Sequence, residues 1–198
     1  FIKSAAKVAK THNYCKPKIV IDKNKSFIDA VKLRHPIAER IRQDVEYVPH
    51  NISLGKEMDG MLLFGLNSAG KSTLMKAIGI SIIMAQTGQY VPSESFTYSP
   101  YNSVFARITG SDNIFKGLSQ FSLEMTELDA IIKRNGPKTL VIGDEVCRGT
   151  EHVSGNTIVA TTIILLAELK CSFIFATHLH EIAEMKRIKE LNNVQIFH

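Results

Sequence analysis

The sequence contains little cysteine: its three thiols, at Cys15, Cys147 and Cys171, lie far apart in the chain. No two of them have the short spacing of a metal site or a redox pair, so a reducing compartment is the simplest setting. The sequence also lacks any apolar run near the roughly 18 residues that suggest a membrane span. Its first residues lack the apolar centre of a signal peptide. These absences predict an intracellular protein that does not enter a membrane.

The two ends of the sequence predict that it is part of a longer protein. It does not begin with methionine, and residues 193–198 stop inside an alternating pattern that is typical of a strand. A length of 198 residues, 44% of them hydrophobic, suits a single domain over residues 1–198. The formal net charge of +5 comes mostly from lysines in the first 25 residues. We interpret this run as a solvated face and expect no direct DNA contact from it.

The most specific motif lies at residues 65–72, which read Gly-Leu-Asn-Ser-Ala-Gly-Lys-Ser. It fits the phosphate-binding loop of P-loop nucleotidases and stands between an apolar strand pattern and an apolar helix pattern. Glycine lets the backbone turn so that successive N–H groups face phosphate oxygens, and the following helix adds its positive end. Lys71 is expected to neutralise the β- and γ-phosphates, and Ser72 to bind Mg²⁺. The alternative is an ordinary strand-to-helix turn with an exposed lysine.

Strand and helix patterns alternate through most of the chain and predict an α/β fold. The predicted helices cover residues 1–12, 37–42, 72–86, 119–134, 156–169 and 179–188. The predicted strands cover residues 18–21, 26–33, 47–54, 61–64, 104–108, 139–143, 171–176 and 193–198. This order predicts a mostly parallel central sheet with helices on both faces. The first 60 residues are richer in strands and predict an antiparallel flank, while residues 1–12 look like the tail of an upstream helix.

Two acids directly follow the apolar strand pattern at residues 139–143. Asp144 is expected to hold Mg²⁺, and Glu145 to polarise an attacking water. His178 follows the next strand pattern and is expected to contact the γ-phosphate or the water, whereas His180 is expected to be a surface or packing residue. Because ligands gather at the carboxyl ends of parallel strands, the loop, the acids and His178 should share one edge of the sheet. The alternatives are exposed loop acids and a structural histidine.

Taken together, these motifs resemble the C-terminal ATPase domain of the MutS DNA mismatch-repair family, which is of the ABC type. The resemblance covers essentially the whole chain, and the joint occurrence of the motifs is more specific than any one of them. The matching segments are Arg-His-Pro at 34–36, the phosphate loop extended to Met75, Gly-Gln-Tyr-Val-Pro at 88–92, Ser-Gln-Phe-Ser-Leu-Glu-Met-Thr-Glu at 119–127, Asp-Glu-Val-Cys-Arg-Gly-Thr at 144–150 and Ala-Thr-His-Leu-His-Glu at 176–181.

The resemblance implies roles for individual residues. Tyr47 matches the aromatic position that stacks on adenine, with a core aromatic as the alternative. Ser119 matches a serine offered in trans to the γ-phosphate of the other subunit, with helix capping as the alternative. Residues 148–155 would line the same dimer interface. The catalytic groups would be Glu145, His178 and Lys71, the Mg²⁺ ligands Ser72 and Asp144, and the further nucleotide contacts Gly65, Leu66, Asn67, Ser68, Ala69, Gly70 and Thr73.

The sequence departs from the family pattern at several positions. The family usually has Pro where Leu66 stands and Gly where Ala69 stands, and a small residue at 69 should still admit phosphate. Gly143 replaces an apolar strand residue, Cys147 replaces a glycine, and Glu151 stands where a small hydroxyl residue is common. These departures suggest a divergent branch in which the dimer contacts are altered and the chemistry is kept.

The resemblance implies a Mg²⁺-dependent ATPase whose two sites form between two facing domains, identical or different. Its turnover would control a clamp on mismatched double-stranded DNA through regions outside this sequence. One alternative is another ABC-type ATPase, of a transporter or a chromosome-organising protein. The short spacing between Lys71 and Asp144 leaves no room for a long coiled-coil insertion of that kind. The other alternative is a nucleotide-gated DNA-binding module with little turnover.

Overall fold

A computed structural model of the chain describes residues 2–41, 46–65, 70–107, 120–147 and 151–197. Its helices are α1 (Ile2–Thr11), α2 (Ala38–Ile41), α3 (Lys71–Gln86), α4 (Gln120–Lys133), α5 (His152–Glu168), α6 (Glu181–Glu184) and α7 (Lys186–Lys189). Its strands are β1 (Lys18–Ile19), β2 (Phe27–Leu33), β3 (His50–Leu54), β4 (Gly60–Leu63), β5 (Ser95–Ser99), β6 (Ser103–Arg107), β7 (Thr139–Asp144), β8 (Ser172–Ala176) and β9 (Val194–Phe197). None of the helices in these ranges has both the length and the hydropathy needed to cross a bilayer.

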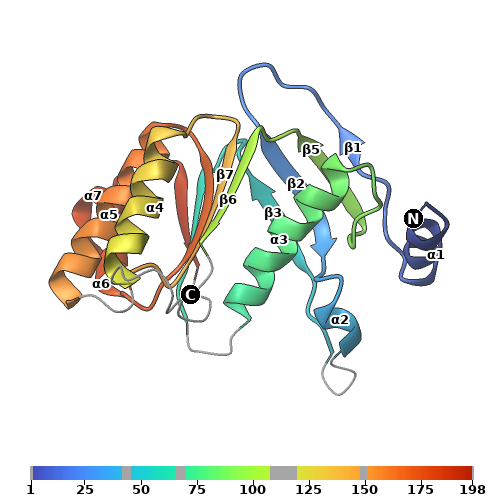
Figure 1. Cartoon of the computed structure of the whole chain (residues 1–198), viewed down its shortest axis with the longest axis horizontal. Helices are drawn as coiled ribbons and strands as arrows, with labels where there is room; N and C mark the ends of the chain where they lie inside the picture. The colour runs from blue at the N-terminus through green and yellow to red at the C-terminus, as the bar shows by residue number, and fades with distance from the viewer. Residues whose placement is uncertain (1, 42–45, 66–69, 108–119, 148–150, 198) are drawn as a thin grey trace.

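Five strands form a parallel sheet in the order β6-β7-β8-β4-β9, as Figure 1 shows. Every described pair in this sheet is parallel, and helices lie between successive strands in the chain. The predicted α/β class with a mostly parallel sheet is therefore confirmed. The register aligns Leu63 with Ala176, and Ala176 with Asp144, so that β4, β8 and β7 end at the same edge.

A second sheet has the order β1-β5-β2-β3, and it corrects the predicted flank. The flank is antiparallel at β2–β3 and β2–β5, but β1 pairs with β5 in parallel. The strand β5 was missed, and it comes from residues after α3, not from the first 60. The apolar pattern of β5 is short, because Phe96 and Tyr98 are its only large buried residues and the positions around them are serines and a threonine. Such a strand forms only when its neighbours bury that one face.

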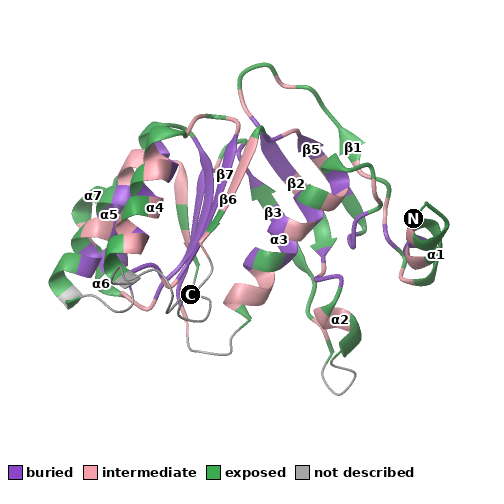
Figure 2. Cartoon of the chain, in the orientation of Figure 1, coloured by how far each residue is buried: buried purple, intermediate pink, exposed green. Residues whose placement is uncertain are grey.

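The molecule is layered, with α3 packed between the two sheets, and α4 and α5 on the far side of the parallel sheet (Figure 1). One core joins apolar residues of α3, such as Met75 and Ile82, to residues of both sheets. The other core packs α4, α5 and α6 against the opposite face of the parallel sheet. Figure 2 shows this sheet as buried along most of its length. Helices thus cover both of its faces, as predicted, and the three central strands β4, β7 and β8 are buried at every position.

Most element boundaries lie within two positions of the predicted ones, and three elements differ by more. β3 begins at His50, so Tyr47 lies in irregular structure before the strand. α5 begins four positions earlier than predicted, because the Glu151 carboxylate accepts hydrogen bonds from the backbone N–H groups of Val153 and Ser154. The predicted helix at 179–188 is two short helices, since Met185 between them is extended, with φ −63° and ψ 126°.

The structure explains why a glycine, and not a larger apolar residue, occupies position 143. It pairs in register with Phe175 on β8, and an added Cβ would lie 2.8 Å from the nearest atom of that ring. We expect Gly143→Val to lower the free energy of unfolding by about 1–3 kcal/mol through overpacking, measured by urea denaturation. Gly136→Ala is the matched control, because its Cβ would meet no atom within 4 Å. Equal stability of the two variants would contradict this packing.

Candidate functional site at the carboxyl edge of the parallel sheet

Three neighbouring strands deliver the predicted site residues to one edge. β4 leads into Gly65, β8 into Thr177 and His178, and β7 into Glu145. Backbone hydrogen bonds continue past the strand ends, from Glu145 N to Ala176 O at 2.9 Å and from Thr177 N to Leu63 O at 3.2 Å. Gly65 at the start of the predicted loop, the acids and His178 therefore follow strands that end at one edge of the sheet.

The described ends of the predicted phosphate loop include a left-handed glycine, while Leu66, Asn67, Ser68 and Ala69 lie outside the described residues. Gly70 immediately precedes α3 with φ 86° and ψ 3°, a left-handed conformation that side chains disfavour. Lys71 Nζ donates a hydrogen bond to Gly65 O at 2.6 Å and so joins the two ends of the loop.

The first turn of α3 carries Lys71, Ser72 and Thr73, all half-buried. The N–H groups of such a turn have no partner inside the helix and point toward its N-terminal end. Together with the positive end of the helix dipole, they favour an anion at this position. The arrangement can therefore bind a phosphate group beside the loop.

Glu145 and His178 form a close pair at the same edge. Glu145 Oε1 lies 2.5 Å from His178 Nε2, and the two side chains are 16% and 33% exposed. With a proton on Nε2 the imidazole donates to the carboxylate, and the contact orients both groups. Glu145 has φ 50°, which is uncommon outside glycine, so its backbone is held by the surrounding structure.

The other acid of the motif, Asp144, ends β7 and is 7% exposed. Carboxylate and hydroxyl oxygens are the ligand types that Mg²⁺ accepts, and Mg²⁺ keeps several waters when it binds through one or two protein groups. The donor types of Asp144 and Ser72 fit such an ion. Within the described ranges, no three His, Cys, Asp or Glu residues are grouped as a metal cluster.

A cavity of about 310 Å³ adjoins the phosphate loop, at the lower end of the size range of small-ligand sites. Its walls come from β3, β4, the end of β9 and the start of α3. The described lining residues are His50, Asn51, Ile52, Met61, Leu63, Phe64, Gly65, Gly70, Lys71, Leu74 and Phe197. The lining is mainly apolar, with the loop ends and Lys71 as its polar rim.

Tyr47 is half-buried and does not belong to the described lining of this cavity. Burial raises the pKa of its phenol above the ordinary value, while a backbone hydrogen bond at His35 opposes that shift. The phenol hydroxyl therefore lies near the backbone of the segment that begins at residue 35. This packing is the structural alternative for Tyr47, and its stacking on adenine stays a prediction.

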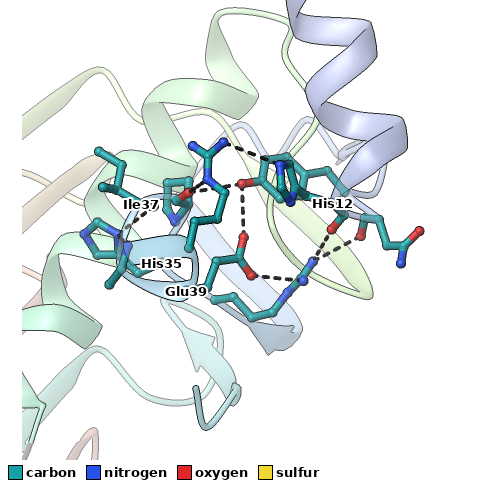
Figure 3. A network of polar contacts seen from close by, with 10 residues as sticks. His12, His35, Ile37 and Glu39 are labelled. Carbon is teal, nitrogen blue, oxygen red and sulfur yellow. Dashed lines mark hydrogen bonds and ion pairs between the residues drawn. The ribbon is translucent and has the colours of Figure 1, made fainter. Parts of the chain in front are cut away.

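A polar network ties this segment to α1, as Figure 3 shows. Glu39 accepts a hydrogen bond from the Tyr14 hydroxyl at 3.1 Å and lies 3.0 Å from Arg34 Nη1. Arg34 Nη2 in turn donates to His12 O and Asn13 O, each at 3.1 Å. The residues that directly follow α1 are thereby fixed to Arg34 and Glu39.

Two histidines, His35 and His180, have structural roles, and His180 is the one expected to be a surface or packing residue. His35 Nδ1 accepts hydrogen bonds from Ile37 N and Ala38 N, both at 3.2 Å, and so caps α2. Burial is the largest cause that lowers the pKa of this imidazole, followed by the charge of Lys76. His180 packs its ring against Phe64, with centroids 5.6 Å apart.

The predicted trans-acting serine, Ser119, lies outside the described residues, as do residues 148–150 of the predicted interface. The part of that interface that is described begins at Glu151, whose carboxylate caps α5 and accepts a hydrogen bond from Ser154 Oγ at 2.6 Å. Glu151 is thus the N-cap of α5, a role that a hydroxyl residue at this position could also have.

Comparisons with known proteins all match this chain to proteins of one family. The family model described as MutS domain V matches residues 61–198. The chain is 46% identical to a putative DNA mismatch repair protein mutS homolog of Acanthamoeba polyphaga mimivirus, over 100% of this chain and 21% of that protein. It is 43% identical to the mitochondrial DNA mismatch repair protein mutS homolog of Sarcophyton glaucum, over 92% of this chain and 19% of that protein. It is 36% identical to DNA mismatch repair protein MutS of Clostridium kluyveri, over 96% of this chain and 22% of that protein. The chain thus spans about a fifth of the length of these relatives.

Proposed function

Because this chain belongs to the MutS family of DNA mismatch-repair proteins, we propose that it binds ATP with Mg²⁺ and hydrolyses it. The observation that carries the proposal is the convergence of a phosphate-loop sequence, two acids and a histidine at one edge of a parallel sheet. An apolar cavity of about 310 Å³ beside the loop gives room for the nucleoside part of the ligand.

The proposed roles follow from where each group is held. Attack of water on a γ-phosphate needs positioning and charge neutralisation more than covalent help. The loop, residues 65–73, cradles the phosphates with its N–H groups, and Lys71 exchanges its contact with Gly65 O for phosphate oxygens. Glu145 accepts the proton of the attacking water, and His178 holds the carboxylate in place beside the γ-phosphate.

Ser72 and Asp144 would hold Mg²⁺, which supplies positive charge to the β- and γ-phosphates when it is bound. Ser72 stands in the first turn of α3 and Asp144 at the end of β7. A buried carboxylate of this kind is stabilised when a cation or hydrogen-bond donors neutralise it. The carboxylate of Asp144 and the hydroxyl of Ser72 are ligand types that Mg²⁺ accepts.

We also propose that two such domains face each other, with Ser119 of each reaching the nucleotide of the other. ATP would then add contacts that exist only in the closed pair, so that binding and hydrolysis shift the pair between states. The relatives are named as DNA mismatch repair proteins. By analogy, the shift would regulate binding to mismatched DNA through regions outside this chain.

A second candidate, a nucleotide-gated module with little turnover, is favoured by one contact. His178 Nε2 lies 2.5 Å from the Glu145 carboxylate, so the base already has a partner in the structure described here. If that contact keeps the carboxylate turned away from the attacking water when ATP is bound, hydrolysis is slow. Membership of the MutS family removes the basis for a transporter or chromosome-organising assignment.

The test is ATP hydrolysis by the complete natural protein in the presence of Mg²⁺. We expect release of inorganic phosphate that stops when EDTA removes the metal and resumes when excess Mg²⁺ is returned. ATP binding, measured with a fluorescent analogue, should weaken in EDTA for the same reason. Phosphate release that is unaffected by EDTA would contradict the proposed metal site, and tight ATP binding without release would favour the second candidate.

A further inference from the structure

Glu124 is a buried carboxylate that lies outside the candidate site. It sits on α4 and is 7% exposed, whereas the neighbouring acid on the same helix, Glu127, has a side chain that is 40% exposed. An ionised carboxylate is costly to bury unless hydrogen bonds or an opposite charge compensate it. The partners of Glu124 therefore indicate why an acid occupies this position.

One of those partners belongs to the turn after the two acids. Glu124 Oε1 accepts a hydrogen bond from the backbone N–H of Cys147 at 3.1 Å. Arg107, at the end of β6, lies near the same oxygen, with Nε at 3.7 Å, and its Nη1 contacts Glu127 Oε2 at 2.9 Å. Both acids of α4 thus share Arg107, but the described contact with the turn is made by Glu124.

The turn that Glu124 contacts has an unusual backbone. Glu145 has φ 50° and Cys147 has φ 63°, so two of the three residues at 145–147 are non-glycine residues with left-handed backbone. Each such residue is disfavoured in isolation and persists where the surroundings fix it. Here the turn is held on one side by the bond from Glu145 N to Ala176 O, and on the other by the bond from Cys147 N to Glu124.

We infer that Glu124 is a positioning residue for Glu145, through its hydrogen bond to the backbone of Cys147. The catalytic consequence rests on the proposed function, because Glu145 matters to turnover only if it acts on the attacking water. Without the carboxylate at 124, the N–H of Cys147 is left buried and unpaired, and the turn can relax toward ordinary backbone angles. The Glu145 carboxylate would then leave its place beside His178.

The experiment compares Glu124→Ala with Glu127→Ala in the complete protein. Both variants remove an acid that contacts Arg107, but Glu124→Ala alone removes the bond to the turn. Hydrogen exchange at residues 144–147 should be about tenfold to a hundredfold faster in Glu124→Ala and near wild type in Glu127→Ala. ATP turnover should also be slower in Glu124→Ala, with kcat lower by about tenfold or more. Its KM should stay within about threefold of wild type, because the proposed phosphate-binding residues are unchanged.

Conservative variants separate positioning from folding. Glu124→Gln keeps an oxygen that can accept from Cys147 N, so its exchange rate and kcat should return most of the way to wild type. Glu124→Asp keeps the charge but shortens the side chain by one methylene, so it should behave like Glu124→Ala, and it serves as the test if the alanine variant does not fold.

The two proposals fail in different ways. Equal exchange at residues 144–147 in Glu124→Ala and Glu127→Ala would overturn the inference, as would equal losses of kcat. A wild-type protein that binds ATP without turning it over would contradict the proposed hydrolysis. In that case the exchange comparison by itself decides whether Glu124 holds the turn.

Discussion

Replacing Glu145 with glutamine is expected to lower kcat for ATP by about 100-fold or more, which is the usual loss when a positioned general base is removed. Glutamine has nearly the same shape and can still contact His178 Nε2, so the turn and the imidazole stay in place. ATP affinity should change little, because in the proposed function the phosphates are held by the loop and the start of α3 and not by Glu145. Steady-state phosphate release and a direct ATP-binding titration measure the two quantities.

The matched control is Glu57→Gln. Glu57 is exposed and lies in the turn before β4, at the edge of the sheet opposite to the candidate site. The same loss of one negative charge should leave kcat within about twofold of wild type, because a single exposed charge so far away is largely screened. If the Glu145 variant turned over ATP as fast as this control, Glu145 would not be the base.

The second large effect is expected for Lys71→Met, which keeps the apolar stem and removes the ammonium. Hydrogen bonds to charged groups contribute about 1.5–3 kcal/mol. The dissociation constant for ATP should therefore rise by about tenfold to a hundredfold, and turnover should fall as well. In the structure Lys71 bonds to Gly65 O, so a small loss of stability should accompany the change. Isothermal titration with ATP measures the binding, and thermal unfolding measures the stability.

Lys133→Met provides the comparison for that experiment. Lys133 lies in the last turn of α4, its side chain is 72% exposed, and it pairs with Asp129 four positions earlier. Such surface pairs contribute little to stability, so both ATP affinity and unfolding should stay near wild type. Unchanged ATP affinity in Lys71→Met would show that residues 65–72 are not the phosphate loop of this protein.

Local sequence patterns determined most of the site. A glycine-containing loop between an apolar strand and an apolar helix, and acids directly after a buried strand, are readable because each depends on neighbours in the chain. The strand order then follows from a general rule, since parallel strands in one sheet end at a common edge. For that reason the gathering of Gly65, Glu145 and His178 could be expected before the structure was known.

Other features depend on partners that are distant in the sequence, so no local sequence pattern predicts them. β5 became a strand because β1 and β2 flank it, α5 gained a turn through the Glu151 cap, and Gly143 is small because Phe175 lies over it. The role inferred for Glu124 is of the same kind.

In this protein, then, the sequence by itself determined the fold class and predicted the phosphate loop, the acids and the histidine of the candidate site, because those depend on hydrophobic periodicity and short-range motif chemistry. Only the tertiary structure decided which groups hold those residues: His178 against Glu145, Gly65 O against Lys71, and Glu124 against the backbone of Cys147. The physical reason is that a hydrogen bond between residues on different elements requires both elements to be packed in place, and packing is a property of the whole core.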